Sequence, residues 1–481
     1  MNFLKELNTL LKSRHSIIYI TTSEEERLQY NILELLKEKS NWTFNTWDFI
    51  RGYYNNPNDK GVGIRNPLKA LEFAEDQCNN SPAIFILKDF DNFLSDISIT
   101  RKIKNISYQF KLRYIIITAS SVKIPTGLEE SITIINFPLP SEDEIRGELI
   151  NLINLTNKNL STELIDKIVS SCQGLSLEKI RRIFARILVE YNDIKSNYIN
   201  IILEEKKQVI NKTQILEFYY SAEKLSTIGG LNNLKKWLSI RSESFSKKAE
   251  LYGLSTPKGL LLVGVQGTGK TLTAKAIANE WKMPLLKLDV GKLFGGLVGE
   301  SELKIRQMIQ IAEAMAPCII WIDEIDKAFT GIYSQSDSGT TGRVFSTLTT
   351  WLSEKQSKVF IIATANNLDL LPTELIRKGR FDEIFFVDLP SKQERQSIFE
   401  ILLKKIRPNT YKNYDIKYLS DISNQYSGAE IEQLIMEAMY LAYSENRGKL
   451  CTKDIISSIE NSIPLACTNQ STIKKLQELV E

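Results

Sequence analysis

The stretch GVQGTGKT at residues 264–271 constrains the fold of this chain more than any other. Four apolar residues at 260–263 precede it, and apolar residues at helical spacing follow it from Leu272 onward. This pattern predicts a strand, a loop and a helix in that order. In that frame the loop glycines let backbone N–H groups converge on an anion at the positive end of the helix. The stretch therefore predicts a phosphate-binding loop inside an α/β domain.

Two side chains of the loop are expected to act directly on a nucleotide. Lys270 would reach the β- and γ-phosphates, and the Thr271 hydroxyl would bind Mg²⁺. Val265 and Gln266 stand at variable positions of the G-x-x-x-x-G-K-T pattern, so no required contact is lost. The alternative is a chance glycine-rich turn, which the strand-to-helix frame disfavours. The expected cofactors are ATP and Mg²⁺, and the loop residues expected to bind them are Gly264, Val265, Gln266, Gly267, Thr268, Gly269, Lys270, Thr271 and Leu272.

A pair of acids follows a second apolar run, PCIIWIDEID. A buried parallel strand over 318–322 would deliver Asp323 and Glu324 to the edge of the sheet where ligands bind. Asp323 would support Mg²⁺ through its water shell, and Glu324 would orient and polarise the water that attacks the γ-phosphate. Alone, such a pair is more often the start of a helix. Combined with the phosphate-binding loop, it favours nucleotide hydrolysis.

Two further patterns follow along the chain. The strand KVFIIATANN ends with Asn366, whose amide can hydrogen-bond a γ-phosphate or the attacking water, although a polar residue also simply ends strands. The stretch LIRKGRFDE then places Arg377 and Arg380 three residues apart. These cations could form a surface ion-pair cluster, or they could complete the site of a neighbouring subunit as arginine fingers.

Taken together, these patterns resemble the AAA family of ATPases. The motifs STIGGL, GVQGTGKT, LVGESELKIR, CIIWIDEID, ATANN, IRKGRFD and YSGAEIEQL follow that family in order and spacing over about residues 222–465. The resemblance implies an α/β P-loop AAA module, a parallel sheet flanked by helices, with a small helical lid. It also implies a first sensor at Asn366 and two arginine fingers that act in trans at Arg377 and Arg380. The residues that it implies around the adenine are Ile228 and Gly229 on one side and, in the lid, Gly428 and Ala429.

The family also implies an activity and an assembly. A member would hydrolyse Mg-ATP as a homo-oligomer, a hexameric ring, in order to remodel or regulate a protein complex. A slow ATP-gated switch and a nucleotide-locked scaffold are the alternatives. Members that thread polypeptide carry an aromatic residue before G-E-S-E, whereas this chain has Leu297 and Val298. Leucine grips a passing chain less well than an aromatic ring, which weakens the threading hypothesis.

The first half of the chain resembles a degenerate copy of the second. SPAIFILKDFDNF aligns with APCIIWIDEIDKA at an offset of 235 residues, and this places Lys88 on Asp323 and Asp89 on Glu324. YIIITASS aligns with FIIATANN, and CQGLSLEKIRRIF with YSGAEIEQLIMEA. After the first strand, TTSEEER replaces the glycines and the lysine, so we expect no nucleotide there. An unrelated α/β adaptor domain is the alternative.

We therefore expect four parts: a degenerate AAA-like domain over 1–210, the large ATPase domain over 211–390, the lid over 391–465 and a tail over 466–481. Residues 204–230 are expected to form a linker helix that leads into the ATPase module. The net charge of +3 indicates no nucleic-acid partner, and one histidine with five scattered cysteines disfavours zinc. No run is long enough for a membrane span or resembles a signal peptide. The frequent Ile, Asn and Lys, with the resemblance, favour an algal chloroplast stroma or a cyanobacterial cytoplasm.

Overall fold

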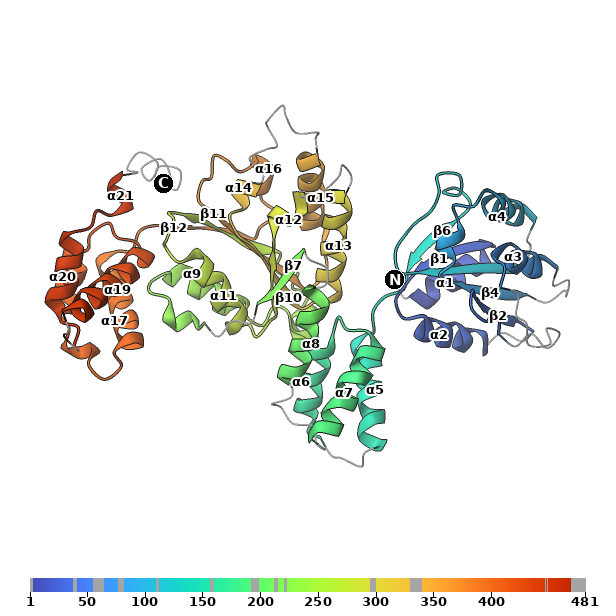
Figure 1. Cartoon of the computed structure of the whole chain (residues 1–481), viewed down its shortest axis with the longest axis horizontal. Helices are drawn as coiled ribbons and strands as arrows, with labels where there is room; N and C mark the ends of the chain where they lie inside the picture. The colour runs from blue at the N-terminus through green and yellow to red at the C-terminus, as the bar shows by residue number, and fades with distance from the viewer. Residues whose placement is uncertain are drawn as a thin grey trace. The chain divides into compact units, whose positions relative to one another are not determined.

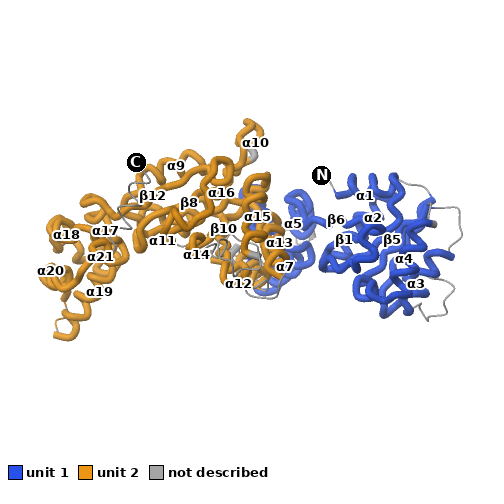
Figure 2. The backbone as a smooth tube through the Cα atoms, turned by 90° about the horizontal axis from the view of Figure 1, so that it is seen from above, with its two compact units in different colours: residues 1–202 blue, residues 203–481 orange. Residues whose placement is uncertain are grey.

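The computed structural model describes residues 3–37, 41–54, 65–76, 82–109, 112–155, 160–191, 199–211, 215–219, 223–294, 300–328, 340–445, 447 and 449–468. The chain divides into two compact units, residues 1–202 and 203–481 (Figure 2). Each unit contains a six-stranded sheet with helices on both faces (Figure 1). Within the described ranges, no helix has the length and apolar character needed to cross a membrane.

The first unit is built on a mostly parallel sheet of strand order β3-β2-β4-β5-β1-β6. Its central strands are continuous apolar runs, as expected of strands covered on both faces. Alternate residues of each strand face opposite helix layers, so that Ile18 packs with α1 and α2 while Tyr19 packs with α3 and α4. The strands are β1 (Ile17–Thr21), β2 (Thr43–Asp48), β3 (Gly52–Tyr53), β4 (Ala83–Lys88), β5 (Arg113–Ala119) and β6 (Thr133–Asn136).

Helices follow the strands of the first unit and then continue without strands. The layer helices are α1 (Phe3–Lys12), α2 (Glu25–Lys37), α3 (Pro67–Asp76) and α4 (Ile97–Gln109). After β6 the chain forms α5 (Glu142–Leu155), α6 (Thr162–Cys172) and α7 (Leu177–Tyr191), and then α8 (Ile199–Asn211), which crosses the division between the units. Ser161 caps α6 by accepting a hydrogen bond from the Leu164 amide.

The second unit repeats this design around the phosphate-binding loop. Its sheet has the order β12-β8-β11-β10-β9-β7, and β8 lies between β11 and β12. Leu261 and Val263 of β8 pack against the layer of α13 and α15, whereas Leu260 and Leu262 pack against α9 and α11. The strands are β7 (Leu216–Tyr219), β8 (Gly259–Gly264), β9 (Leu285–Leu288), β10 (Cys318–Ile322), β11 (Val359–Ala365) and β12 (Glu383–Val387).

The helices of the second unit form two flanking layers and a separate lid (Figure 1). Those around the sheet are α9 (Asn232–Arg241), α10 (Lys247–Leu251), α11 (Lys270–Glu280), α12 (Val290–Phe294), α13 (Glu300–Ala314), α14 (Ile325–Ala328), α15 (Thr340–Glu354) and α16 (Thr373–Ile376). The lid has its own apolar core, centred on Phe399 and Ile435. Its helices are α17 (Lys392–Ile406), α18 (Ile416–Ile422), α19 (Gly428–Ser444), α20 (Thr452–Glu460) and α21 (Leu465–Thr468).

The two sheets share one topology. Reading β1, β2, β4, β5 and β6 onto β8, β9, β10, β11 and β12 gives the same spatial order, and each sheet adds one short antiparallel edge strand beside the second strand of that series. In both units an acid shortly after the corresponding strand has a left-handed backbone: φ is 50° at Asp89, the first residue after β4, and 50° at Glu324, the second after β10. A shared order and a shared rare conformation support the prediction that the first half is a copy of the second.

One segment differs from our prediction. The linker helix expected within 204–230 ends at Asn211, and Leu216–Tyr219 is instead the edge strand β7. Leu216 and Phe218 are buried while Glu217 and Tyr219 are half-buried, a period of two that a strand satisfies and a helix does not. β7 pairs antiparallel with β9, so this segment completes the sheet of the second unit.

Candidate functional site

One pocket of about 360 Å³ brings together residues from the phosphate-binding loop, two strand ends and the lid. This convergence follows from the sheet, because the carboxyl ends of β8, β10 and β11 meet at one edge. Of the residues predicted from the sequence, those that line the pocket are Ile228, Gly229, Gln266, Gly267, Thr268, Gly269, Lys270, Thr271, Leu272, Asp323, Glu324, Asn366, Gly428 and Ala429.

The loop holds the Lys270 ammonium over its own carbonyl groups. Lys270 Nζ donates to the carbonyl oxygens of Gly264 and Val265, each at 2.7 Å. Gly264 and Val265 thus lie outside the pocket lining but contact the lysine that lines it. Burial lowers the pKa of Lys270 to about 8, against the opposing attraction of Asp326, Asp323 and Glu324. A desolvated ammonium that reaches only neutral carbonyls binds an anion strongly, because the anion replaces the solvation that the lysine has lost.

Thr364 links the two acids that the sequence predicts. Its hydroxyl donates to Asp323 Oδ1 at 2.6 Å and accepts a hydrogen bond from the Glu324 amide at 3.0 Å. Thr271 Oγ1 lies 3.4 Å from the same Asp323 oxygen. Asn366 Nδ2 donates to Glu324 Oε1 at 3.3 Å. The predicted metal pair, the predicted water-activating acid and the predicted sensor therefore share one hydrogen-bonded cluster.

Asp326 holds the backbone next to this cluster, a role that we did not assign from the sequence. It is buried, and its Oδ2 accepts hydrogen bonds from the backbone amides of Asn366 and Asn367, both at 3.1 Å. These two bonds fix the end of β11 and hence the position of the Asn366 side chain. Asp326 is the last residue of the DEID stretch in the sequence, but only the fold shows that it holds the end of β11.

The other end of the pocket is apolar and is formed partly by the lid. Ile398, Ile401 and Leu402 of α17 line it together with Ile228 and Ala429. An apolar slot next to a phosphate-binding loop suits a flat purine base. The three α17 residues were missed in the sequence, because their spacing is that of an ordinary amphipathic helix.

Direct contacts hold the lid beside the loop. The Ala429 amide at the start of α19 donates to the Gly267 carbonyl at 3.1 Å. Gly267 has a φ of 82°, and a Cβ there would lie 2.8 Å from Ser427 Oγ, so this close approach requires glycine. Ser427 and Glu430 form a capping box that shapes the start of α19. On the other wall, Lys235 Nζ donates to the Ile228 carbonyl at 2.6 Å.

Arg377 and Arg380 do not join the residues that line this pocket. Arg377 is exposed and ends α16, while the Arg380 guanidinium donates to the Glu374 carbonyl. Both arginines remain candidates for acting on another subunit. Leu297 and Val298, on which we based the doubt about threading, lie outside the described residues.

The side chains present fit Mg-ATP. The described residues contain no group of three or more His, Cys, Asp or Glu side chains that could hold a metal alone. Mg²⁺ is usually held by one or two protein ligands together with water and nucleotide phosphates, and the Thr271 hydroxyl and the Asp323 carboxylate, 3.4 Å apart, are ligands of that kind. Thr271 and Asp323 would hold the ion, Lys270 and the loop amides the phosphates, and the apolar end the base. Bound Mg²⁺ would neutralise phosphate charge.

The corresponding place in the first unit is filled by an ion-pair cluster. Three residues join β1 to α2, whereas five join β8 to α11, so the shorter connection leaves no loop for phosphate. Arg27 pairs with Glu24 at 2.8 Å and with Glu144 at 3.1 Å, and its guanidinium lies 4.1 Å from the centroid of the Phe137 ring.

The same cluster ties α7 to the sheet. Glu24 Oε1 accepts a hydrogen bond from the Leu177 amide at 2.6 Å, at the start of α7. This contact occupies the place of the bond from Ala429 to Gly267 in the second unit. Lys88 pairs with Glu25 at 3.5 Å. Here the acid begins the helix and the lysine ends the strand, whereas in the second unit Lys270 begins the helix and the acid Asp323 follows the strand. A carboxylate thus occupies the helix start that a phosphate-binding loop would offer to its ligand.

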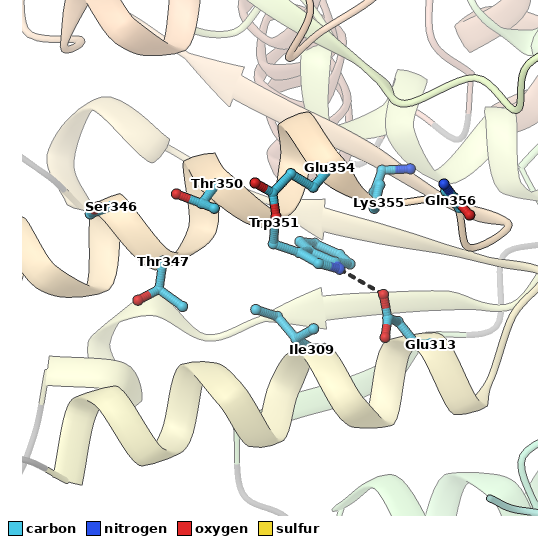
Figure 3. Close-up of a pocket in the computed structure, with 9 residues that line it drawn as sticks. All are labelled: Ile309, Glu313, Ser346, Thr347, Thr350, Trp351, Glu354, Lys355 and Gln356. Carbon is cyan, nitrogen blue, oxygen red and sulfur yellow. Dashed lines mark hydrogen bonds between the residues drawn. The ribbon is translucent and has the colours of Figure 1, made fainter. Parts of the chain in front are cut away.

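A second hollow, of about 600 Å³, lies between α13 and α15 (Figure 3). Its floor carries Ile309 and Trp351, and the indole Nε1 donates to Glu313 Oε1 at 2.8 Å. None of the residues predicted for the nucleotide site lines this groove.

Comparisons with known proteins agree with this geometry. The family "ATPase family associated with various cellular activities (AAA)" matches residues 260–389, and "AAA+ lid domain" matches 413–457. The models "SpoVK-like AAA ATPase, N-terminal domain" and "SpoVK-like AAA ATPase, second domain" match residues 3–137 and 143–213. Fold and pocket thus define an AAA ATPase module with its lid, preceded by an α/β domain and a helical domain.

Full-length relatives narrow the family. The "uncharacterized AAA domain-containing protein ycf46" of Guillardia theta is 54% identical over 480 residues, which cover 99% of this chain and 95% of the relative. That of Pyropia yezoensis is 53% identical, with 99% and 97% covered. A proteasome-activating nucleotidase of Saccharolobus islandicus is 33% identical over 302 residues, 61% of this chain and 75% of the relative. The chain belongs to the family of the AAA domain-containing ycf46 proteins.

Two alanine substitutions should separate the two units. Lys270→Ala should abolish ATP binding, because it removes the ammonium that the loop holds for phosphate. Arg27→Ala should leave ATP affinity unchanged but destabilise the first unit by about 3 kcal/mol, because it strands the buried Glu24 carboxylate. Titration calorimetry measures the affinity, and hydrogen exchange of β1 and α2 amides measures the stability. Loss of ATP binding in Arg27→Ala would show that the first unit holds nucleotide.

ATP binding should take up protons just above neutral pH. At pH 8.5 a fraction of the molecules has a neutral Lys270 amine, because the pKa of Lys270 is lowered to about 8. The phosphates should raise that pKa and so protonate the amine. Affinity should therefore fall as the pH rises from 8 to 10. Calorimetry in two buffers of different ionisation enthalpy measures the uptake. Lys355→Gln is the control, since burial also lowers the Lys355 pKa to about 8 away from the pocket; loss of the uptake in that variant would contradict the assignment to Lys270.

Proposed function

We propose that this protein is an Mg-ATP hydrolase that works as a homo-oligomer, a hexameric ring, and remodels or regulates a protein complex. The observation that carries the proposal is the pocket that joins the Lys270 loop, Asp323, Glu324, Asn366 and the lid. Thr271 and Thr364 there lie in hydrogen-bonding range of Asp323, and Asn366 donates to Glu324. We place the protein in a chloroplast or a cyanobacterial cytoplasm.

The roles follow from chemistry and position. Lys270 and the loop amides bind the phosphates, and Thr271 with Asp323 holds Mg²⁺. Glu324 accepts a hydrogen bond from the attacking water and orients it, while Asn366 positions Glu324 and the γ-phosphate. Charge on the transferred phosphoryl group is then stabilised by Arg377 and Arg380 of an adjacent subunit, because neither lines its own pocket.

One specific observation keeps a slower function, that of an ATP-gated switch, as the alternative. The first unit has an ion-pair cluster around Arg27 where the second unit has its phosphate-binding loop, so we infer a single working site per chain. A single site whose ATPase rate depends on assembly with another subunit would serve an ATP-gated switch as well as a motor. The lid contact from Ala429 to Gly267 also lets nucleotide move the lid, which either function requires; a nucleotide-locked scaffold would leave Glu324 without use.

The steady-state ATPase rate tests this proposal directly. Wild type should hydrolyse ATP, and Glu324→Gln should bind ATP with unchanged affinity and turn over at least about a hundredfold more slowly, because the water loses its base. Equal rates in the two proteins would reject hydrolysis at this site and leave the scaffold. If the variant is slow as expected, proteins that copurify with ATP-bound Glu324→Gln would identify the complex on which the ATPase acts.

Mixing subunits tests the action in trans. Arg377→Ala and Glu324→Gln should each be inactive alone, with a loss from the missing arginine of about 10³-fold. Mixtures should recover part of the activity, because some interfaces combine an intact Glu324 with an intact Arg377. Activity of the mixture is compared with the sum of the separate proteins, and mass in solution is measured with and without ATP. A monomer at every nucleotide state, with no recovery on mixing, would contradict the ring.

A further inference from the structure

Glu324 stands on the wall between two cavities. Its side chain lines the nucleotide pocket of about 360 Å³ and also a side cavity of about 450 Å³. The side cavity runs under β9 and α12 and is lined by Lys287, Asp289 and Phe294 among others. The Glu324 carboxylate can turn toward either cavity, and only the first contains the phosphate-binding loop.

Lys327 holds the carboxylate from the side cavity. It belongs to the short helix α14, three residues after Glu324, and its Nζ donates to Glu324 Oε2 at 2.9 Å. Lys327 lines the side cavity and is not among the residues that line the nucleotide pocket. The ammonium therefore draws Glu324 away from the place where a water would attack ATP.

Both oxygens of Glu324 are engaged in this arrangement. Oε2 faces Lys327, and Oε1 accepts from Asn366 Nδ2 at 3.3 Å. The Glu324 backbone is fixed by its φ of 50° and by the hydrogen bond to Thr364 Oγ1, so the side chain alone can move. To act on water, an oxygen of Glu324 must leave one of these donors and face the γ-phosphate.

Of the lysines that line the side cavity, Lys327 is the one with a hydrogen bond to Glu324 in the described part of the chain. Lys287 lies 4.9 Å from the centroid of the Trp321 ring. Lys292 does not line the cavity but pairs with Glu217 and Asp289, which do. The Lys327 side chain is 64% exposed and that of Glu324 is 40% exposed. An exposed pair of this kind is weak and costs little to break, as a latch that opens in each catalytic cycle must.

We propose that Lys327 is a positioning residue that latches Glu324 in a resting orientation, and that hydrolysis requires Glu324 to leave it. This proposal rests on the proposed ATPase function. Removing the latch increases the fraction of time in which Glu324 faces the nucleotide. Since exposed ion pairs are weak, Lys327→Ala should raise kcat for ATP about twofold to fivefold. KM for ATP should change less than kcat, because Lys327 does not line the nucleotide pocket.

The test measures kcat and KM for ATP in the full-length chain with a double-mutant cycle. Lys327→Arg keeps the cation and should restore a rate close to that of wild type. Glu324→Gln with Lys327→Ala should be as slow as Glu324→Gln alone, because the gain acts through Glu324. Lys358→Ala is the matched control: it breaks an ion pair with Glu250 at 3.1 Å in the same unit, away from both cavities.

The outcomes separate this proposal from the ATPase assignment. A rate of Lys327→Ala equal to or below that of wild type overturns the latch, and a lower rate would mean that Lys327 helps Glu324 to activate water. A gain that persists in the double variant overturns it as well. If wild type and Glu324→Gln hydrolyse ATP equally slowly, the proposed function fails, whichever way Lys327→Ala behaves.

Discussion

The desolvated ammonium of Lys270 is the interaction on which the site depends. Burial costs a charged amine several kcal/mol unless partners restore its solvation, and here the partners are the Gly264 and Val265 carbonyls of its own loop. The sheet makes this arrangement possible, because β8 lies inside it between β11 and β12 and ends at the loop. Burial lowers the pKa of Lys270, and the acids that oppose this shift, Asp326, Asp323 and Glu324, follow β10. The fold therefore buries the Lys270 ammonium, and a bound phosphate would supply the charged partner that burial has removed.

The first unit shows what the same scaffold becomes without that lysine. Its strands keep their order, since the apolar layers on both faces remain. The connection after the first strand is shorter, and Glu24 and Glu25 stand where an ammonium would be required. Arg27 and Lys88 restore neutrality from within the protein. The Glu24 carboxylate joins the sheet to the start of α7 through protein groups alone, an arrangement that suits rigid support.

Much of this could be predicted from the sequence, because strand ends and helix starts are local. A glycine-rich loop after LLLV and an acid pair after CIIWI place side chains at one sheet edge without knowledge of the rest. Long-range contacts could not be predicted in this way. Ile398 and Leu402 reach the pocket only because the lid folds back, and β7 was taken for helix because four residues are too short to show their period. The pair of Lys327 and Glu324 is local but was not predicted either, because Glu324 has a left-handed backbone that its residue type does not indicate.

Two separate requirements then govern turnover at the proposed site. The arginines that would stabilise transferred charge lie outside their own pocket, and the acid that would activate water is drawn toward a second cavity. In the proposed ring one requirement would be met by a neighbouring subunit and the other within the subunit, so their effects on the barrier would add and their effects on the rate would multiply. A lone subunit would bind ATP while hydrolysing it slowly. Assembly alone would lift one barrier, so the orientation of Glu324 leaves a second point at which a bound partner could set the rate.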